Sequence, residues 1–590
     1  MSRKKARYEL TAWQKMALAD LREAAAEQPG TLRLMGVPVR GPGDSVAVTV
    51  RLHTGTLPRA DGGLTLKDQE EFVLTLPALQ LSTITVDVTH LRFAGYPHVL
   101  QGHRLCVFLD PAREWDPVRG GMRAFLNRLW SWLTDAAAGR FNPSTAMYHA
   151  VGGVLHHTPG TPTIVVRESV PDNHIQIGFL SARGGQRLDL SYGPPPAAGG
   201  SLRVPVVTLP TALPLGGGSS LSDLLARLDA PDLLQQHGPS SQVAPHSPAI
   251  LTALATSAFR NPAGSPQYLV LAVPHPAGGP PHLLTPRLPA PVADGLRRLL
   301  LEHGTALNLN ASHIRSDLLI EWCPVSDERP AVTTRRDNGT PISGFFGKHV
   351  QVWGCGGLGS WMAEFAVRAG AAQVSVCDPG TVTGGLLVRQ NYVEADVGAP
   401  KALALADRLR AISDTVVVHA NDGILPPLDD TAFAMADVVI DATVSIAMGH
   451  VLNHLAAVTG PRPVLAQVAT DVRTGTLGLL SVSAPGTVRG PSDVDASAGQ
   501  AVLADPALEL YHPLWQDSPD GDELVPTRGC SVPTFHGSSA DLAAVAGTLM
   551  SFLGMHLKTP TSGTHLVALP HAAGSPHHRF VAHQEAASQF

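Results

Sequence analysis

Two cations and a glutamine follow a glycine-rich segment in the C-terminal half of this chain. The segment, residues 354–359, reads Gly-Cys-Gly-Gly-Leu-Gly, and Arg389, Gln390 and Lys401 come after it. A glycine turn between a strand and a helix presents backbone N–H groups and the positive end of the helix dipole, which together can bind a polyphosphate. Two cations beyond the turn suit phosphate cleavage, because negative charge builds on the departing oxygens. The spacing therefore favours ATP over NAD.

The apolar pattern around these residues predicts the elements that position them. A strand is expected at 348–353, followed by the glycine turn, a helix, and a second strand that ends at Asp378. An acidic side chain at that strand end can accept hydrogen bonds from ribose hydroxyls. The glycines of the turn are the candidate backbone contacts to the nucleotide: Gly354, Gly356, Gly357 and Gly359.

This region resembles the adenylation domain of ThiF/MoeB-type and ubiquitin-activating enzymes. The resemblance covers most of residues 345–550 and includes the glycine turn, Asp378, the Arg-Gln pair at Arg389, the Gly-Ala-Pro-Lys of residues 398–401 and a buried strand that ends at Asp441. By that resemblance the aspartate of the second strand binds ribose, the arginine and the lysine bind phosphates, and ATP and Mg²⁺ are the cofactors. A Rossmann-like α/β adenylation domain is expected in the C-terminal part of the chain, with bounds of 341–590.

One position departs from the pattern of that family and concerns the metal ion. Many members have a second aspartate three residues after the position of Asp441, as a magnesium contact, and Val444 stands there in this chain. Asp441 is then the nearest substitute as a metal ligand. The chain has five cysteines but no Cys-x-x-Cys pair, so the structural zinc site of some relatives is not expected.

Cys530 is the candidate acceptor of an activated acyl group. It lies in a Gly- and Pro-containing segment between Arg528 and His536, whose side chains could favour the reactive thiolate. Such a segment predicts a mobile loop. The alternative is a buried structural cysteine. The catalytic interpretation is favoured, because the polar, Gly- and Pro-rich surroundings are unlike a core element. The resemblance implies the role: such enzymes convert a C-terminal carboxylate into an acyl-adenylate, and many then pass the acyl group to a cysteine.

Cys106 is a second candidate thiol, in the N-terminal part of the chain. It follows the Tyr-Pro-His that ends at His98, and it precedes the Trp-Asp-Pro of residues 115–117 and a helical pattern at 122–133. This order resembles ubiquitin-conjugating enzymes, in which the cysteine forms a thioester. His98 stands where that family has asparagine. Two roles are open to it: its imidazole N–H can donate to a developing oxyanion, or the residue shapes the turn without taking part in the chemistry. Residues 1–160 are expected to form a ubiquitin-conjugating-like α+β domain.

The remaining composition indicates a multidomain enzyme with no affinity for nucleic acid. A chain of 590 residues is too long for one core, and residues 161–340, with several Gly- and Pro-rich interruptions, are expected to form a folded connector. The net charge of −6 and the absence of a basic, aromatic-rich stripe argue against nucleic-acid binding. No uninterrupted apolar run approaches the ~20 residues that span a bilayer, so a cytoplasmic protein is expected.

Together these features predict a relay in one chain. A protein C-terminus is adenylated at residues 354–401, transferred to Cys530, then to Cys106, and finally joined to an amine of a target, because a thioester stores part of the free energy of ATP. Fused activating and conjugating domains resemble the antiphage proteins of bacterial CBASS operons, which implies a cyclic-nucleotide-making nucleotidyltransferase as the modifier and a homodimeric enzyme. The alternatives are a sulfur-carrier adenylyltransferase, an NAD-dependent oxidoreductase and a noncatalytic scaffold.

Overall fold

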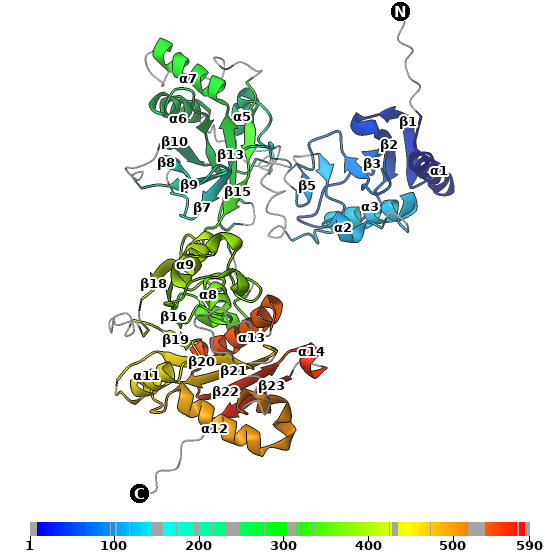
Figure 1. The fold of residues 1–590 in the computed structure, drawn as a ribbon. Coiled ribbons are helices and arrows are strands. Elements are labelled where there is room, and N and C mark those ends of the chain that lie inside the picture. Colours follow the sequence, from blue (N-terminus) through cyan, green and yellow to red (C-terminus); the bar gives the residue numbers. More distant parts are fainter. Residues whose placement is uncertain are drawn as a thin grey trace, which may run out of the picture. The chain divides into compact units, whose positions relative to one another are not determined.

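The computed structural model divides the chain into two compact units, residues 1–334 and residues 335–590 (Figure 1). The expected domain boundary at residue 341 lies just inside the second unit. The structure describes residues 9–94, 96–100, 103–116, 119–142, 157–172, 174–193, 200–213, 216–229, 247–275, 278–303, 314, 318–333, 337–423, 425–426, 435–458, 460–471, 474–516, 537–574 and 577–583. Each part is described by itself below.

The N-terminal part of the first unit is an antiparallel sheet preceded and followed by helices. Its described strands lie in the order β1-β2-β3-β4-β6-β5. The elements are α1 (Ala12–Glu27), β1 (Leu32–Arg40), the 3₁₀ turn η1 (Pro42–Asp44), β2 (Val46–His53), β3 (Gln69–Leu76), β4 (Thr85–Asp87), β5 (Val99–Leu100), β6 (Arg104–Leu105), α2 (Pro111–Glu114) and α3 (Gly121–Ala137). This arrangement is α+β, and the helix expected at residues 122–133 is confirmed by α3.

Local sequence rules explain why these elements form. Thr11 and Gln14 make a capping box in which each side chain accepts a hydrogen bond from the backbone N–H of the other, and this fixes the start of α1. In β2 every second residue from Val46 onward is buried, as expected for a strand with one face on a core. Phe125 and Leu129 of α3 are fully buried in the same core. The segment that carries Cys106 therefore follows a well-packed sheet.

The second part of the first unit is a mixed sheet with helices packed on one face. The described strands follow the order β11-β13-β12-β10-β8-β9-β7-β15, and β14 pairs with β13. Its elements are β7 (Thr163–Val166), β8 (Ile175–Ala182), β9 (Arg187–Ser191), β10 (Ser201–Thr208), α5 (Leu221–Leu228), α6 (Ser247–Arg260), β11 (Gln267–Tyr268), β12 (Val270–Val273), β13 (His282–Leu288), α7 (Ala290–His303), β14 (Glu321–Cys323) and β15 (Val325–Asp327). Leu269 separates β11 from β12, and the connector is folded with an apolar core, as expected.

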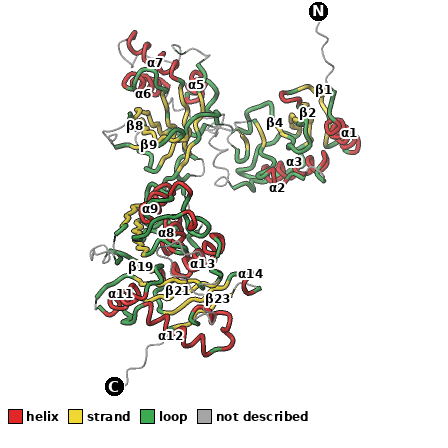
Figure 2. Tube along the Cα trace, viewed as in Figure 1, coloured by secondary structure: helices red, strands yellow, loops and turns green. Residues whose placement is uncertain are grey.

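The second unit has a doubly wound α/β fold. Its elements are η5 (Pro341–Phe345), β16 (His349–Trp353), α8 (Gly359–Arg368), β17 (Gln373–Cys377), η6 (Gly384–Leu386), η7 (Glu394–Asp396), α9 (Lys401–Ile412), β18 (Val417–Asn421), β19 (Val438–Asp441), α11 (Ile446–Ala457), β20 (Val464–Thr470), β21 (Leu477–Ser483), α12 (Pro491–Ala504), η8 (Pro506–Leu514), α13 (Ser539–Lys558), β22 (Gly563–Ala568), α14 (Pro570–Ala573) and β23 (His577–Ala582). Helices and strands alternate along the first half of this unit (Figure 2).

The sheet of the second unit is parallel in its first five strands and antiparallel in the rest. The order is β18-β17-β16-β19-β20-β21-β22-β23, and the pairings are parallel from β18 through β20. Helices α8, α9 and α13 pack on one face through residues such as Met362, Leu405 and Leu549, while α11 and α12 cover the other through Leu452 and Val502 (Figure 1). In such sheets ligands bind beyond the carboxyl ends of the parallel strands, where β16, β17 and β19 end. The Rossmann-like expectation for this part of the chain is therefore confirmed.

Helix α13 is the one described helix that is long and apolar enough to cross a membrane by length and composition alone. Its apolar residues Leu542, Val545, Leu549 and Leu553 are buried in the core of the second unit. The helix also contacts α8 and β21. Its apolar character is explained by this packing, because a helix in the core of a large domain needs apolar residues on its covered side.

Candidate functional site

The glycine turn requires glycine at two of its positions. Gly354 has a φ of +88°, and a Cβ atom there would lie 2.9 Å from the carbonyl oxygen of Ala442. A Cβ on Gly359 would overlap the carbonyl oxygen of Gly354. The turn therefore brings the end of β16 close to the end of β19 and starts α8 directly beneath the turn. Added Cβ atoms on Gly356 and Gly357 would lie 4.0 Å from the Gln390 side-chain nitrogen and 3.1 Å from Leu542.

Asp378, expected to bind ribose, fastens the glycine turn to the end of β17. One carboxylate oxygen accepts a hydrogen bond from the backbone N–H of Cys355 at 2.7 Å, and the other accepts one from the N–H of Gly380 at 2.7 Å. Each ionised oxygen can accept more than one hydrogen bond, so this arrangement leaves acceptor capacity for a hydroxyl group. The carboxylate is half-buried and lies beside the turn.

Helix α8 holds the Arg-Gln segment against the turn through three neutral hydrogen bonds. The indole N–H of Trp361 donates to the carbonyl oxygen of Arg389 at 3.3 Å. The backbone N–H of Asn391 donates to Ser360 Oγ at 3.1 Å, and that hydroxyl donates in turn to the Gly356 carbonyl at 2.7 Å. The backbone on both sides of the predicted phosphate contact is thus tied to the helix that begins at the turn.

Glu364 adds a charged anchor to the same segment. It is 5% exposed and accepts hydrogen bonds from Asn391 Nδ2 at 2.6 Å, from Arg408 Nε at 2.8 Å and from Arg368 Nε at 2.8 Å. Burial alone would raise the pKa of Glu364, but these three hydrogen bonds outweigh burial and lower that pKa. A buried carboxylate satisfied in this way fixes its partners rigidly.

The residues predicted to contact phosphate are buried around the turn. Arg389 and Gln390 are each 7% exposed and Lys401 is 4% exposed. Burial lowers the pKa of Arg389. The Oε1 atom of Gln390 is buried and makes no hydrogen bond to the described residues. The hydroxyl of Tyr392 lies 2.8 Å from the Cys355 carbonyl and 3.3 Å from the Lys401 carbonyl, so it joins the turn to the start of α9.

Cations with little exposed surface are costly unless an anion neutralises them. Arg389 and Lys401 lie in a turn-and-helix frame that presents backbone N–H groups, and the backbone carbonyls of both residues accept hydrogen bonds, from Trp361 and Tyr392 respectively. This combination is what a nucleotide phosphate requires. The residues that make the frame were missed by the sequence analysis, which noted only the glycines, the aspartate and the cations; these are Ser360, Trp361, Glu364, Asn391 and Tyr392.

Asp441, the predicted metal ligand, is the last residue of β19. Its side chain is fully buried; Oδ1 accepts hydrogen bonds from the Thr443 N–H at 2.9 Å and from Thr443 Oγ1 at 2.6 Å, whereas Oδ2 has no partner among the described residues. Burial raises the pKa of Asp441 although both contacts to Thr443 oppose this. Mg²⁺ is commonly held by one or two carboxylates plus substrate phosphates, and Oδ2 fits such a role. Within the described part of the chain there is no group of three or more His, Cys, Asp or Glu side chains that could hold a metal without a substrate.

Val444 takes an unusual conformation beside this carboxylate. It has a φ of +56° and is 70% exposed, and the neighbouring Ile446 is 82% exposed. A β-branched residue at positive φ is strained. Ser445, between them, receives a hydrogen bond from the N–H of Met448 and caps α11. The position that carries an aspartate in many adenylating enzymes is therefore an exposed apolar residue here, so Asp441 is left as the candidate metal ligand.

Cys106 lies at the end of β6 and is half-buried. Its backbone N–H donates to the His98 carbonyl at 2.8 Å, and its thiol donates to the Phe108 carbonyl at 3.2 Å. Burial raises the pKa of this thiol, Glu114 raises it further, and Arg128 lowers it. Among the described cysteines, the other three are buried: Cys323, Cys355 and Cys377. Cys106 is thus the described thiol with access to solvent.

His98 lies in the turn before β5 and has a φ of +64°. It is 6% exposed, and its ring packs edge-on against Phe141 with the ring centres 4.9 Å apart. Burial and then Arg128 lower the pKa of His98, so its imidazole is neutral near pH 7. The structure therefore brings His98 and Cys106 together through the backbone.

Cys530, Arg528 and His536 lie outside the described residues. The described chain ends before them at Gln516 and resumes at Gly537, two residues before α13. The backbone N–H of Ser539, the first residue of α13, donates to the Val388 carbonyl at 2.8 Å. The start of α13 is thus attached to the residue that precedes Arg389.

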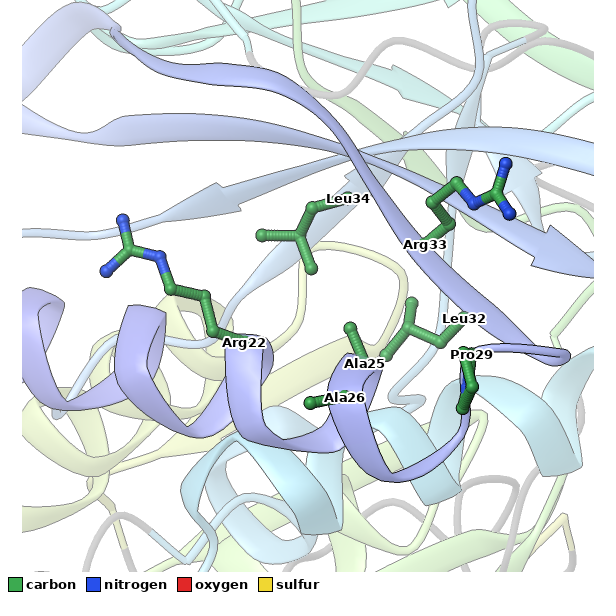
Figure 3. A pocket seen from close by; sticks show the side chains of 7 residues that line it. All are labelled: Arg22, Ala25, Ala26, Pro29, Leu32, Arg33 and Leu34. Carbon is green, nitrogen blue, oxygen red and sulfur yellow. The ribbon is translucent and has the colours of Figure 1, made fainter.

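A shallow hollow lies between α1 and β1, away from the Cys106 segment in sequence (Figure 3). In Figure 3 the side chains of Arg22 and Arg33 extend from the helix and from the strand on either side of Leu34. Apolar residues form most of the remaining lining, and there is no thiol or carboxylate in it. The hollow therefore adds no group that could do the chemistry expected of this chain.

Two family models match the chain. Residues 345–545 match the ThiF family, and residues 200–328 match the Cap2 central linker domain. The ThiF match covers most of the second unit, which is called the ThiF domain below. The ThiF domain contains the glycine turn, the buried cations and Asp441, and the Cap2 linker match lies on the mixed sheet of the first unit.

Curated relatives share part of the chain. An uncharacterized protein y4oA of Sinorhizobium fredii is 26% identical over 34% of this chain and 34% of its own length. The sulfur carrier protein adenylyltransferase of Thermus thermophilus is 34% identical over 19% of this chain and 42% of its own, and the tRNA threonylcarbamoyladenosine dehydratase of Escherichia coli is 28% identical over 29% and 60%. The chain thus spans between about a third and three fifths of the lengths of these relatives.

Solved structures give similarities at lower sequence identity. E. coli MccB is 12% identical, with a TM-score of 0.30 over 42% of this chain and 66% of that chain. Selenomethionine PaaA is 17% identical, with a TM-score of 0.29 over 41% and 75%.

Proposed function

We propose that this chain uses ATP to adenylate the C-terminal carboxylate of a protein and then ligates that protein to an amine. The observation that carries the proposal is the burial of Arg389, Gln390 and Lys401 around a glycine turn at the carboxyl ends of the parallel strands. Two buried cations there would stabilise charge on a departing pyrophosphate, which hydride transfer to NAD does not require. The match of residues 345–545 to the ThiF family supports the same chemistry.

The residues of the ThiF domain have distinct roles in the proposed reaction. The N–H groups of the turn and the start of α8 bind phosphate, and Asp378 accepts a hydrogen bond from ribose beside the turn. Arg389 and Lys401 neutralise the phosphates, and Gln390 offers a buried side-chain oxygen at the same place. Asp441 would hold Mg²⁺ with the phosphates, and that ion would neutralise charge as it develops. The attacking nucleophile is the carboxylate of the modifier, and pyrophosphate leaves.

The acyl group then passes to sulfur. In the proposed relay the Cys530 thiolate attacks the acyl-adenylate and AMP leaves, after which the Cys106 thiolate attacks that thioester and Cys530 leaves as a thiolate. An amine finally attacks the Cys106 thioester. The half-buried, solvent-accessible Cys106 and its tie to the neutral His98 support this order. Each transfer exchanges one activated acyl bond for another, so the free energy of ATP is retained until the amide forms.

The linker match supports the proposed partners. The Cap2 central linker domain is associated with CBASS, which supports a cyclic-nucleotide-making nucleotidyltransferase as the modifier protein. We further propose an amine-bearing target, most simply a lysine, a cytoplasmic location, a homodimer and domain bounds of 1–160, 161–340 and 341–590.

Non-reducing gel electrophoresis tests this function. The full chain is incubated with ATP, Mg²⁺ and a CBASS nucleotidyltransferase that has its native C-terminus; the same nucleotidyltransferase with one extra C-terminal residue is the control. The expected result is an ATP-dependent adduct that a thiol reductant removes, that is absent in Cys530→Ala, and that stalls before the amide product in Cys106→Ala. If the wild-type chain forms no adduct with the native nucleotidyltransferase, the proposal is overturned.

A sulfur-carrier adenylyltransferase is the second candidate, because the T. thermophilus enzyme of that name matches 113 residues at 34% identity. Such an enzyme would need the ThiF site but not Cys106. Full product formation by Cys106→Ala would favour it, whereas loss of product in that variant favours the relay.

A further inference from the structure

The ion pair next to Cys106 is formed by one residue from each of the two helices that follow this thiol. Arg128 of α3 donates to a carboxylate oxygen of Glu114, the last residue of α2, at 3.2 Å. The other oxygen of Glu114 accepts the backbone N–H of Asp110 at 2.8 Å. The pair therefore holds the residue that caps α2 together with α3, directly after the Cys106 segment.

Contacts connect this pair to the sulfur through Phe108. The Cys106 thiol donates to the Phe108 carbonyl at 3.2 Å, and the guanidinium of Arg128 lies over the Phe108 ring, 5.9 Å from its centre. Phe108 also packs against Trp115 and Phe125, with ring centres 5.9 Å and 6.2 Å away. Phe108, whose carbonyl oxygen accepts the hydrogen bond from the thiol, is thus fixed between the cation and the core.

The other charged and titratable groups near the thiol are an ion pair on α2 and a neutral histidine. Asp110 and Arg113 of α2 pair with each other at 3.5 Å, and His98, which is neutral near pH 7, lies on the other side at the turn before β5. Both the thiol and His98 experience the charge of Arg128, and the thiol experiences that of Glu114 in the opposite sense. The charges that change the pKa of the Cys106 thiol are therefore those of Glu114 and Arg128, the two members of one ion pair.

We propose that Arg128 stabilises the Cys106 thiolate and that Glu114 limits this effect by pairing with Arg128, so that the ion pair sets the reactivity of the sulfur. The inference rests on the proposed function, in which Cys106 is twice a thiolate. When it receives the acyl group, its sulfur attacks a thioester carbonyl and the donor sulfur leaves. When an amine attacks, the new C–N bond forms, the C–S bond breaks, sulfur leaves with the electron pair and the amine proton passes to water. A nearby cation favours the thiolate in both steps.

The test measures alkylation of Cys106 by iodoacetamide in the full chain, without ATP or modifier, and quantifies the modified Cys106 peptide by mass spectrometry. We expect Arg128→Gln to slow alkylation at pH 7 about three-fold and Glu114→Gln to accelerate it by a similar factor, because a charge near a partly buried thiol changes its thiolate fraction by this order. Arg128→Lys, which keeps the charge, should remain close to wild type.

The opposite expected changes in alkylation rate distinguish an electrostatic role of the ion pair from a purely structural one. Both substitutions break the same ion pair, so a purely structural role would move the two rates in the same direction, and that result would overturn the proposal, as would unchanged rates in both. Arg123→Gln is the matched control, because Arg123 lies on the same helix and pairs with Glu27 at 2.6 Å. Thermal melting of each variant checks folding, and the gel assay above reports the proposed function independently of this measurement.

Discussion

The ThiF site and the Cys106 site place their reactive groups in different surroundings. In the ThiF domain Arg389, Gln390 and Lys401 are at most 7% exposed and are held by neighbours that are themselves hydrogen-bonded. At the other site Cys106 is half-buried and the adjacent ion pair is about one third exposed. The first site is preorganised by buried contacts, whereas the second is adjusted by charges at the edge of solvent. The first should be sensitive to the loss of a single buried group, and the second to ionic conditions.

Loss of the buried lysine is expected to have the largest effect. Lys401→Ala should lower ATP-dependent adduct formation by about 100-fold or more, because removal of one preorganised donor to developing charge typically costs that much. The rate of adduct formation with the nucleotidyltransferase measures it. Arg410→Ala, at the exposed end of the same helix, pairs with Asp407 and should stay near wild type. Equal losses in both variants would mean that α9 acts only as a scaffold.

Removal of the buried carboxylate is expected to come next. Glu364→Ala leaves Arg408 and Asn391 without their shared acceptor, so the free energy of unfolding of the ThiF domain should fall by about 3–5 kcal/mol. Urea unfolding followed by fluorescence measures it. The control is Glu394→Ala, an exposed glutamate of η7, which should change stability by less than about 0.5 kcal/mol. A small effect of Glu364→Ala would show that the frame around Arg389 is not rigid.

Buried histidines give the ThiF domain a stability that depends on pH. His565 is hydrogen-bonded to His556 and to His578 at 2.7 Å each and stacks on Phe552. Burial, reinforced by the two neighbouring imidazoles, lowers the pKa of His565 to about 3. A base whose folded pKa lies below its unfolded value adds stability above about pH 6.5 and loses it as pH falls toward that folded value.

The expected result is a free energy of unfolding that falls between pH 6.5 and pH 4, by at most about 1.4 kcal/mol per pH unit for this one proton. His565→Phe keeps the stacked ring without a titratable group, so the difference between wild type and variant should depend on pH in that window. Urea unfolding at a series of pH values measures this difference. His577→Gln, at the exposed neighbouring position, is the control, and its free energy of unfolding should follow the wild-type pH curve. If the curve of His565→Phe also ran parallel to that of wild type, the lowered pKa of His565 would be contradicted.

The smallest expected effect is a dependence on salt at Cys106. Raising ionic strength from 0.01 M to 1 M shortens the screening length from about 30 Å to about 3 Å. The difference in alkylation rate between Glu114→Gln and wild type should therefore shrink toward zero, while ATP binding to the buried site of the ThiF domain, measured by calorimetry, should change less. A salt-independent difference would mean that Glu114 acts through the position of α2 instead of through its charge.

The sequence predicted the ThiF site because its signals are local. A glycine at positive φ, an aspartate at a strand end and a lysine after Gly-Ala-Pro are determined by backbone geometry within a few residues, and β16, β17 and β19 form where the apolar pattern places them. The supporting residues could not be found this way, since Ser360 and Glu364 reach the Arg-Gln segment across about thirty residues of sequence. The four-residue spacing of Ser360 and Glu364 predicts that they share one face of a helix, but not which residues that face contacts.

The N-terminal site was predicted less completely for a related reason. Cys106 and His98 follow from the order of a turn, a cysteine and a tryptophan, but Arg128 lies on a helix where an arginine is unremarkable as a surface residue. Only the packing of α3 on the Cys106 segment makes its charge relevant. The positive φ at His98 and Val444 likewise has no signature in the sequence, because neither residue type favours that conformation as glycine does.

The hydrogen bond from Ser539 to the Val388 carbonyl gives the ThiF domain a mechanical connection. Val388 adjoins Arg389, the predicted phosphate contact, and Ser539 begins the long helix that follows the Cys530 segment in the sequence. Because this hydrogen bond joins main-chain atoms, a displacement of the Arg389 backbone on nucleotide binding would act directly on the first turn of α13. Under the proposed function, triphosphate binding at Arg389 would therefore act on the N-terminal end of α13, the first described element after the Cys530 segment.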